Sequence, residues 1–228
     1  MMASTDEAKI IRTLERMTSN KASFAGLAEA LGGKWTPEMV RAKAEALDRE
    51  ESSAVFVVRG GVQYFGVETC RDPGLYKVVR RGIERKWAAS ESIPRPQVEP
   101  TFKLSTKLGP WTRPDFVISS QRVIGGVPVT QFHAVEVEQQ GGFDIRSVYQ
   151  AYEQGRGAHF SWVFFAGPIK PEDEWARIKV AAKDCGVGLV HTPRPSAPAG
   201  WKTLLRAKLA TPKPADLNGF RTRCGLFA

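Results

Sequence analysis

Three acidic side chains, Asp115, Glu136 and Glu138, occupy positions where paired strands would bring them together. Asp115 follows Pro114 at the head of the apolar run "PDFVISS", and both Glu lie near the end of "QFHAVEVEQ". Because strand side chains alternate between two faces, Glu136 and Glu138 share one face. Antiparallel pairing around the turn-like "GGVPV" would set the head of the first run beside the tail of the second. Carboxylates in a strand core are costly to desolvate unless something pairs with them.

A divalent cation would remove the repulsion within this acidic group. Neighbouring carboxylates raise each other's pKa values. Mg²⁺ binds hard oxygen ligands, often one or two carboxylates together with phosphate and water. The same ion polarises a phosphodiester and lowers the pKa of an attacking water. The pattern therefore predicts a hydrolytic nuclease site with Mg²⁺ as cofactor and Mn²⁺ as a substitute.

The two runs resemble motifs of the PD-(D/E)xK superfamily, the fold of many restriction endonucleases. Pro114-Asp115 match its first motif and Glu136-Val137-Glu138 its second, and the resemblance spans about residues 100–192. It implies Mg²⁺-dependent cleavage of DNA. It also implies that Asp115 and Glu136 bind the metal, and that these two residues and Glu138 are catalytic.

Position 138 departs from this family, in which Lys usually steadies the attacking water and the phosphate charge. Glu138 could act as a general base or help hold a second metal, and the departure also leaves open a site that no longer cuts. A shifted register would put Gln140 in the place of the Lys. Arg113, as a phosphate contact, and Gln150, on the helix after the motif, are secondary candidates.

The elements that must position these residues predict an α/β (α+β) fold. Residues 101–228 are expected to form a restriction-endonuclease-like mixed sheet flanked by helices. Strands are predicted over 114–120, 131–139, 159–167 and 187–192, and helices over 144–154 and 171–185. A short basic helix over 201–210 and an irregular tail are expected to follow.

Residues 1–68 resemble a winged helix-turn-helix domain. Three helical patterns, the second and third capped by Ser23 and Thr36, precede two β-rich runs joined at Gly60-Gly61. The third helix carries Arg41 and Lys43 as candidate DNA contacts. Residues 69–100 are predicted to be a basic helix followed by a Pro-containing linker or extended arm. That helix carries five further candidates at helical spacings: Lys77, Arg80, Arg81, Arg85 and Lys86.

The composition favours a polyanionic partner. The net charge is +9, and residues 1–70 hold none of this excess, because their acidic side chains outnumber the basic ones. No apolar run is long enough to span a membrane, and three scattered cysteines indicate a reducing cytoplasm. The sequence thus predicts a cytoplasmic DNA endonuclease for restriction or genome defence, and a homodimer is expected because cutting both strands needs two active sites. The alternatives are a non-catalytic DNA-binding regulator on a nuclease-like scaffold and a DNA-repair nuclease.

Overall fold

The computed structural model describes most of the chain, namely residues 5–17, 20–50, 52–65, 73–101, 113–139 and 141–226. The chain divides into two compact units, residues 1–77 and 78–228. The division falls inside the segment 69–100, where the sequence predicts a basic helix and a linker. Within the described ranges, no helix is both long and apolar enough to cross a membrane.

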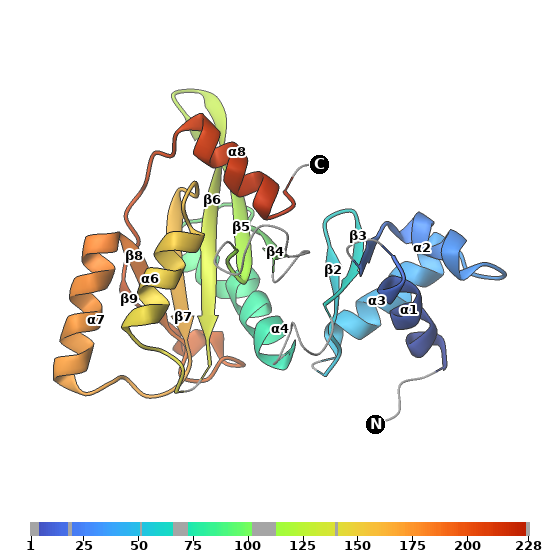
Figure 1. The fold of residues 1–228 in the computed structure, drawn as a ribbon, viewed down its shortest axis with the longest axis horizontal. Helices are drawn as coiled ribbons and strands as arrows, with labels where there is room; N and C mark the ends of the chain where they lie inside the picture. The colour runs from blue at the N-terminus through green and yellow to red at the C-terminus, as the bar shows by residue number, and fades with distance from the viewer. Residues whose placement is uncertain are drawn as a thin grey trace. The chain divides into compact units, whose positions relative to one another are not determined.

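The N-terminal unit combines three helices with a small antiparallel sheet (Figure 1). Its elements are α1 Thr5–Glu15, β1 Lys21–Ala22, α2 Phe24–Leu31, α3 Pro37–Arg49, β2 Val55–Val58 and β3 Gly61–Tyr64. The strand order is β1-β3-β2. The predicted caps of α2 and α3 are confirmed, since Ser23 and Thr36 each accept a hydrogen bond from a first-turn backbone N–H. The apolar stripes of the helices meet the sheet in one core that includes Ile10, Val40 and Val62.

A helical segment leads from the N-terminal unit into the C-terminal unit. It consists of α4 Pro73–Gly82, the π-helical turn η2 Ile83–Trp87 and α5 Ala88–Ser90. A π-helical turn holds an extra residue, so side chains after it are rotated relative to those before it. Trp87 is buried and packs edge-on against Trp162 and Phe164, which anchors this segment to the C-terminal unit.

The C-terminal unit is built on a six-stranded mixed sheet with the order β4-β5-β6-β7-β8-β9. The strands are β4 Gln97–Pro100, β5 Phe116–Ile124, β6 Val127–Glu138, β7 Phe160–Phe165, β8 Val187–His191 and β9 Lys202–Leu205. β6, β7 and β8 are parallel to one another, and the other pairings are antiparallel. The prediction of a mixed α/β fold is confirmed at this level.

Both edge strands differ from the sequence prediction. Residues 97–100, expected in a linker or extended arm, pair with β5 as strand β4. Residues 202–205, expected in a short helix, pair with β8 as strand β9. An isolated helix of that length is marginal in water, whereas the edge of β8 offers a row of unpaired backbone groups.

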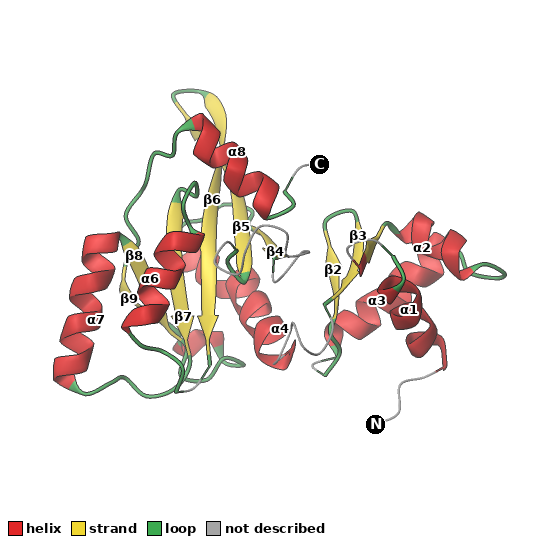
Figure 2. Cartoon of the chain, in the orientation of Figure 1, coloured by secondary structure: helices red, strands yellow, loops and turns green. Residues whose placement is uncertain are grey.

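Three helices cover one face of the sheet, in front of it in Figure 2: α6 Ile145–Gln154, α7 Glu172–Cys185 and α8 Pro214–Arg223. α6 and α7 bury a core against β7 and β8 that includes Val148, Val163 and Ile178. α8 places Phe220 against Phe132 on β6, in a part of the chain predicted to be irregular. Because α8 buries little besides Phe220, it lacks the apolar period that would have predicted it.

Candidate active site

The pairing of β5 with β6 brings Asp115 beside Glu136. The strands are antiparallel, with Phe116 opposite Val135, so Asp115, one residue before β5, lies level with Glu136. The predicted meeting of the head of the first run with the tail of the second is therefore confirmed. The predicted alternation is confirmed too, since Glu136 lies in register with Val163, which belongs to the core under α6.

Asp115 is fixed through both its backbone and its side chain. Its carbonyl oxygen accepts a hydrogen bond from the Thr101 N–H at 2.8 Å, just beyond the end of β4. Its Oδ2 accepts one from the Val137 N–H at 2.8 Å. The latter bond ties the carboxylate to β6 one residue past Glu136, so the edge strand and the central strand together orient Asp115.

Glu136 is a buried carboxylate, 7% exposed, on the face of the sheet that α6 covers. The Gln150 side-chain amide donates to its Oε1 at 2.6 Å. The pKa of Glu136 is raised well above its ordinary value, first by burial, then by the negative charges of Asp115 and Glu138. Gln150, a secondary candidate from the sequence, thus contacts one of the predicted metal ligands.

The second oxygen of Glu136 has no such support. Its Oε2 is buried and has no partner of hydrogen-bond geometry within the described ranges, although the Asp115 backbone N–H lies close enough to lower the pKa of Glu136. The Gln154 side chain lies close enough to lower the pKa of Glu136, while its own Oε1 is likewise buried without a partner in those ranges. Sequence reasoning missed Gln154, although its position four residues after Gln150 places both on one helix face.

Glu138 is turned toward the start of α6. The pKa of Glu138 is raised by burial, lowered by the Ser147 hydroxyl and raised by the charge of Asp144. A Cβ atom on Gly142 would lie 3.1 Å from its Oε2. Asp144 already caps α6 by accepting from the backbone N–H groups of Arg146 and Ser147. Glu138 therefore sits by a helix N-terminus that has its own carboxylate.

The predicted convergence of three carboxylates is reduced to a pair. Asp115 and Glu138 each interact with Glu136, but the described residues include no group of three His, Cys, Asp or Glu side chains that could hold a metal ion together. Gln140, the other candidate for the place of the Lys, lies outside the described residues.

Arginine side chains lie around the end of α8. Arg113, two residues before Asp115 along the chain, is half-buried. The pKa of Arg113 is lowered, first by burial and then by the charge of Arg223, while Cys224 raises it. Arg223, on α8, donates to the carbonyl oxygen of Arg156 at 2.8 Å, just beyond the end of α6. These contacts relate Arg113 to α8 and α8 to the end of α6.

The predicted DNA contacts on the basic helix do not form one exposed face. Lys77 is 2% exposed, and its Nζ donates to the carbonyl oxygens of Leu47 at 2.7 Å and Glu50 at 2.8 Å, at the end of α3. Its interpretation as a phosphate contact is corrected here, because the ammonium is turned into the N-terminal unit. Arg80 pairs with Glu84 at 3.2 Å.

The remaining three differ in exposure. Arg81 is half-buried, whereas Arg85 and Lys86, in the π-helical turn, are exposed. In the N-terminal unit, Arg41 is exposed and lies 4.9 Å from the centre of the Phe24 ring, and Lys43 pairs loosely with Asp6 at 3.8 Å. Of these side chains, Arg41, Arg85 and Lys86 are the most accessible to a nucleic acid.

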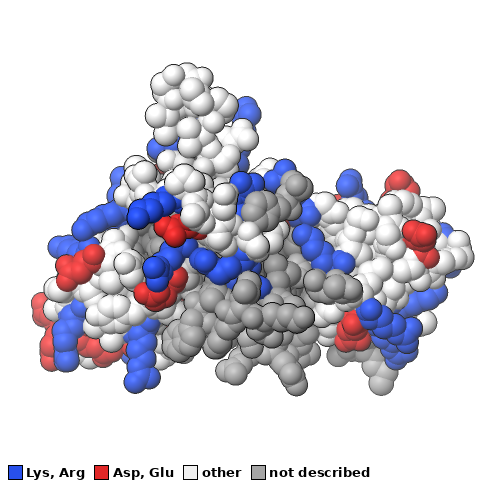
Figure 3. Space-filling model, turned by 45° about the horizontal axis from the view of Figure 1, so that its top comes forward, with Lys and Arg blue, Asp and Glu red and all other residues white. Residues whose placement is uncertain are grey.

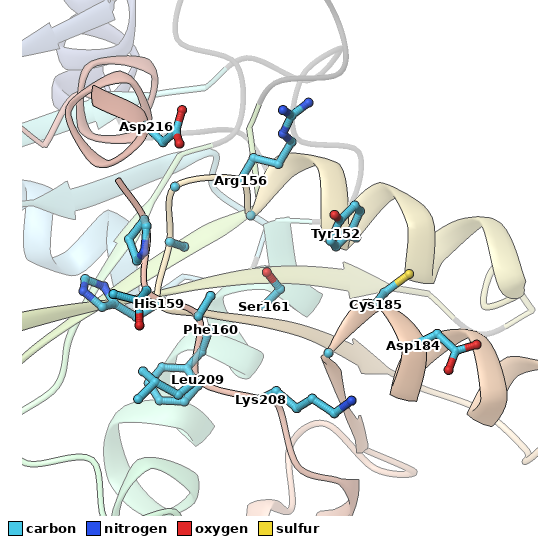
Figure 4. Close-up of a pocket in the computed structure, with 17 residues that line it drawn as sticks. Tyr152, Arg156, His159, Phe160, Ser161, Asp184, Cys185, Lys208, Leu209 and Asp216 are labelled. Atoms are coloured by element: carbon cyan, nitrogen blue, oxygen red, sulfur yellow. The ribbon is translucent and has the colours of Figure 1, made fainter. Parts of the chain in front are cut away.

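A separate pocket of about 390 Å³ lies at the C-terminal ends of α6 and α7, and Figure 4 shows the residues that line it. Two of its polar side chains, those of Lys208 and His159, have partners within the chain. Lys208 donates from its Nζ to the Lys183 carbonyl oxygen at 2.8 Å, and His159 accepts at Nδ1 from the Phe132 N–H at 3.1 Å. Asp115, Glu136 and Gln150 do not line it, so it is distinct from the carboxylate pair.

Comparisons with known proteins give this chain no family. No family model matches it, and no curated protein matches it. A solved structure, the crystal structure of protein VC1899 from Vibrio cholerae, matches at a TM-score of 0.28 and 11% sequence identity. The match covers 87% of this chain and spans 55% of the length of that structure.

Proposed function

We propose that this protein is a metal-dependent DNA endonuclease whose site lies in the C-terminal unit. The observation that carries the proposal is the buried Glu136 carboxylate, which lies beside Asp115 and has one oxygen without a partner in the described ranges. A buried carboxylate next to another is costly unless a positive charge compensates it. A bound cation would supply that charge.

The donor set suits Mg²⁺, with Mn²⁺ as a substitute. Asp115 and Glu136 offer hard oxygen atoms, and Mg²⁺ often takes only one or two carboxylates besides phosphate and water. Asp115 and Glu136 would hold the ion. When bound, it would polarise a phosphodiester and lower the pKa of an attacking water.

The chain's own residues would orient the two carboxylates and would accept a proton from the attacking water. The Val137 N–H holds Asp115 Oδ2, and the Gln150 amide holds Glu136 Oε1, so neither carboxylate must reorganise when substrate arrives. Glu138, whose pKa is raised, is a candidate to take a proton from the attacking water, since a base with a pKa nearer the working pH is more effective. Arg113, two residues before Asp115 along the chain, would contact a phosphate.

The resemblance to the PD-(D/E)xK superfamily supports the same activity. In this proposal the C-terminal unit is restriction-endonuclease-like and the N-terminal unit is a winged helix that helps to bind DNA, with Arg41 on α3 available to the duplex. Cutting both strands needs two sites, so a homodimer in the cytoplasm is proposed. A role in restriction or genome defence rests on family analogy.

A second candidate function is a non-catalytic DNA-binding regulator. It is favoured by Glu138, which replaces the usual Lys and lies against Ser147 and Gly142 at the start of α6. In that case the carboxylate pair would bind no metal, and the arginines would carry the DNA contact alone. A repair nuclease would differ from the first proposal in its DNA substrate and not in its site.

The test compares the full-length protein with Asp115→Asn and Glu136→Gln on supercoiled plasmid and on damaged or branched duplexes. Both substitutions keep the side-chain shape and remove a charge. Nicking that needs Mg²⁺ or Mn²⁺ and disappears in both variants is the expected result. Glu153→Gln, on the exposed side of α6, is the matched control and should nick like the wild type. Equal nicking by all proteins, or none on any of these DNAs, would exclude the endonuclease.

A further inference from the structure

The hairpin formed by β5 and β6 extends beyond the rest of the sheet. β4 pairs only with residues 116–119 of β5, and β7 pairs only with residues 133–138 of β6. Residues 120–124 and 127–131 pair only with each other in the described sheet. Ser120 and Gln131 are still buried, so the projecting part of this two-stranded ribbon is the four pairs from Gln121 opposite Thr130 to Ile124 opposite Val127, about 13 Å long at about 3.3 Å per residue. Figure 1 shows it rising above the other strands.

The tip of this ribbon is apolar and exposed. Val123 is 73%, Ile124 55% and Val127 60% exposed, and they flank a two-residue turn, Gly125-Gly126. Both glycines have positive φ, 60° and 83°, which the tight hairpin turn requires. Such a cluster at a projecting end is more than the scattered apolar residues of an ordinary surface and indicates a contact.

The ribbon is also free of negative charge. Residues 116–135 contain no Asp or Glu, and the charged side chain among them is Arg122. The face in view in Figure 3 shows no acidic side chain at the tip of the projection. Arg122, opposite Val129 behind the tip, donates to the Ser92 carbonyl oxygen at 2.9 Å, and the other polar side chains there are neutral, with Gln121 directly opposite Thr130. A surface of this kind suits a polyanion with a groove that accepts apolar atoms.

We propose that the tip of this ribbon inserts into a groove of duplex DNA, the substrate of the carboxylate pair that the same two strands position. This inference rests on the proposed function, because it takes the substrate of that site to be a duplex. A two-stranded ribbon fits the major groove, and apolar wedges of aliphatic side chains enter the minor groove between base steps. Asp115 directly precedes β5 and Glu136 lies on β6, each five residues along the chain from the ribbon, so contact at the tip would set the position of the carboxylate pair along the duplex.

A second copy of the chain is a poorer occupant. Three aliphatic side chains and a turn offer at most a few hundred Å², whereas a stable interface buries about 800 Å² on each partner. An anionic membrane would use the same apolar tip, but it would leave unused the polar pairs behind the tip and the carboxylate pair on the same two strands. Duplex DNA accounts for the apolar tip, for the absence of acidic side chains from the ribbon, and for the carboxylate pair on the same strands.

The experiment replaces the tip with β-branched polar residues in the full-length protein: Val123→Thr, Ile124→Thr and Val127→Thr together. Threonine keeps the β-branched shape that suits a strand, and the positions are exposed, so the variant should fold, as circular dichroism would verify. The matched control is Val180→Thr with Leu209→Thr, which changes two residues 58% and 61% exposed elsewhere. Binding to a fluorescent 30-bp duplex and to one of its single strands is measured by anisotropy in EDTA.

The tip variant should bind the duplex about tenfold more weakly, equivalent to about 1.4 kcal/mol, and bind the single strand as the wild type does. The control should match the wild type on both. Equal duplex binding, an equal loss on both DNAs, or no duplex binding by the wild type would each overturn the proposal. Tip-dependent binding to phosphatidylserine vesicles or tip-dependent self-association, without an effect on the duplex, would overturn it too. Tip-dependent duplex binding without metal-dependent nicking would refute the endonuclease and leave this inference standing.

Discussion

Replacing Glu136 with Gln should make the protein more stable and abolish its proposed activity. Burial and the charges of Asp115 and Glu138 raise the pKa of Glu136 above its ordinary value of 4.5. The folded state therefore binds more protons than the unfolded state above that pH, and wild-type stability falls as pH rises through this window. Gln at this position carries no charge and can still accept from Gln150.

The magnitude follows from the unpartnered oxygen. A buried acceptor without a donor costs about 1–3 kcal/mol, and more when it is charged. Glu136→Gln should therefore raise the free energy of unfolding by about 1–3 kcal/mol at pH 8, and the gain should vanish near pH 4.5 as the wild-type carboxylate becomes protonated. In a unit of this size each kcal/mol shifts Tm by about 2–4 °C.

Mg²⁺ should stabilise the wild type but not the Glu136→Gln variant. If the ion binds with a Kd on the order of 1 mM, 10 mM Mg²⁺ stabilises the wild type by about 1.4 kcal/mol, and it should leave the Gln variant nearly unchanged. Calorimetry from pH 4.5 to 8.5, with and without Mg²⁺, measures both effects. A variant less stable than the wild type at every pH, or stabilised equally by Mg²⁺, would refute the reasoning.

Three further predictions concern residues outside the carboxylate pair. Lys77→Met should destabilise the N-terminal unit by about 2–4 kcal/mol in urea denaturation, because two hydrogen bonds from a charged donor are lost. At a temperature where the Lys77→Met variant is folded, its DNA affinity should equal that of the wild type. Arg85→Ala with Lys86→Ala should instead reduce the salt dependence of DNA binding. Gly82→Ala should destabilise the C-terminal unit by about 1–3 kcal/mol, since the added Cβ would lie 2.1 Å from the Trp201 ring; an unchanged Tm would contradict that packing. Burial lowers the pKa of His133 to about 3. Between pH 6.5 and 3 the unfolded state therefore binds a proton at this position that the folded state does not bind, and the free energy of unfolding falls as the pH is lowered across that window. His133→Gln should make this fall smaller in a pH series of urea melts.

Local patterns predicted the elements around the candidate site well. Alternation in "QFHAVEVEQ" placed Glu136 on the α6 face, and the caps at Ser23 and Thr36 were readable because a cap is formed within one helical turn. The edge strands were not readable, because β4 and β9 are held by pairing with distant residues and not by their own propensity. The burial of Lys77 also depends on a distant partner, the end of α3.

The direction of Glu138 illustrates why sequence alone could not define the chemistry. Glu136 and Glu138 share a strand face, and on that ground both were expected in one metal site. The register of β6 with α6 separates their surroundings: Glu136 lies against Gln150, and Glu138 lies by the capped start of the same helix. The Val137 N–H, which holds Asp115, and the Gln150 amide, which holds Glu136, orient these two carboxylates from different elements. The pair with oriented oxygens is therefore formed across strands, by Asp115 and Glu136, and Glu138 acts on it through its charge, which raises the pKa of Glu136.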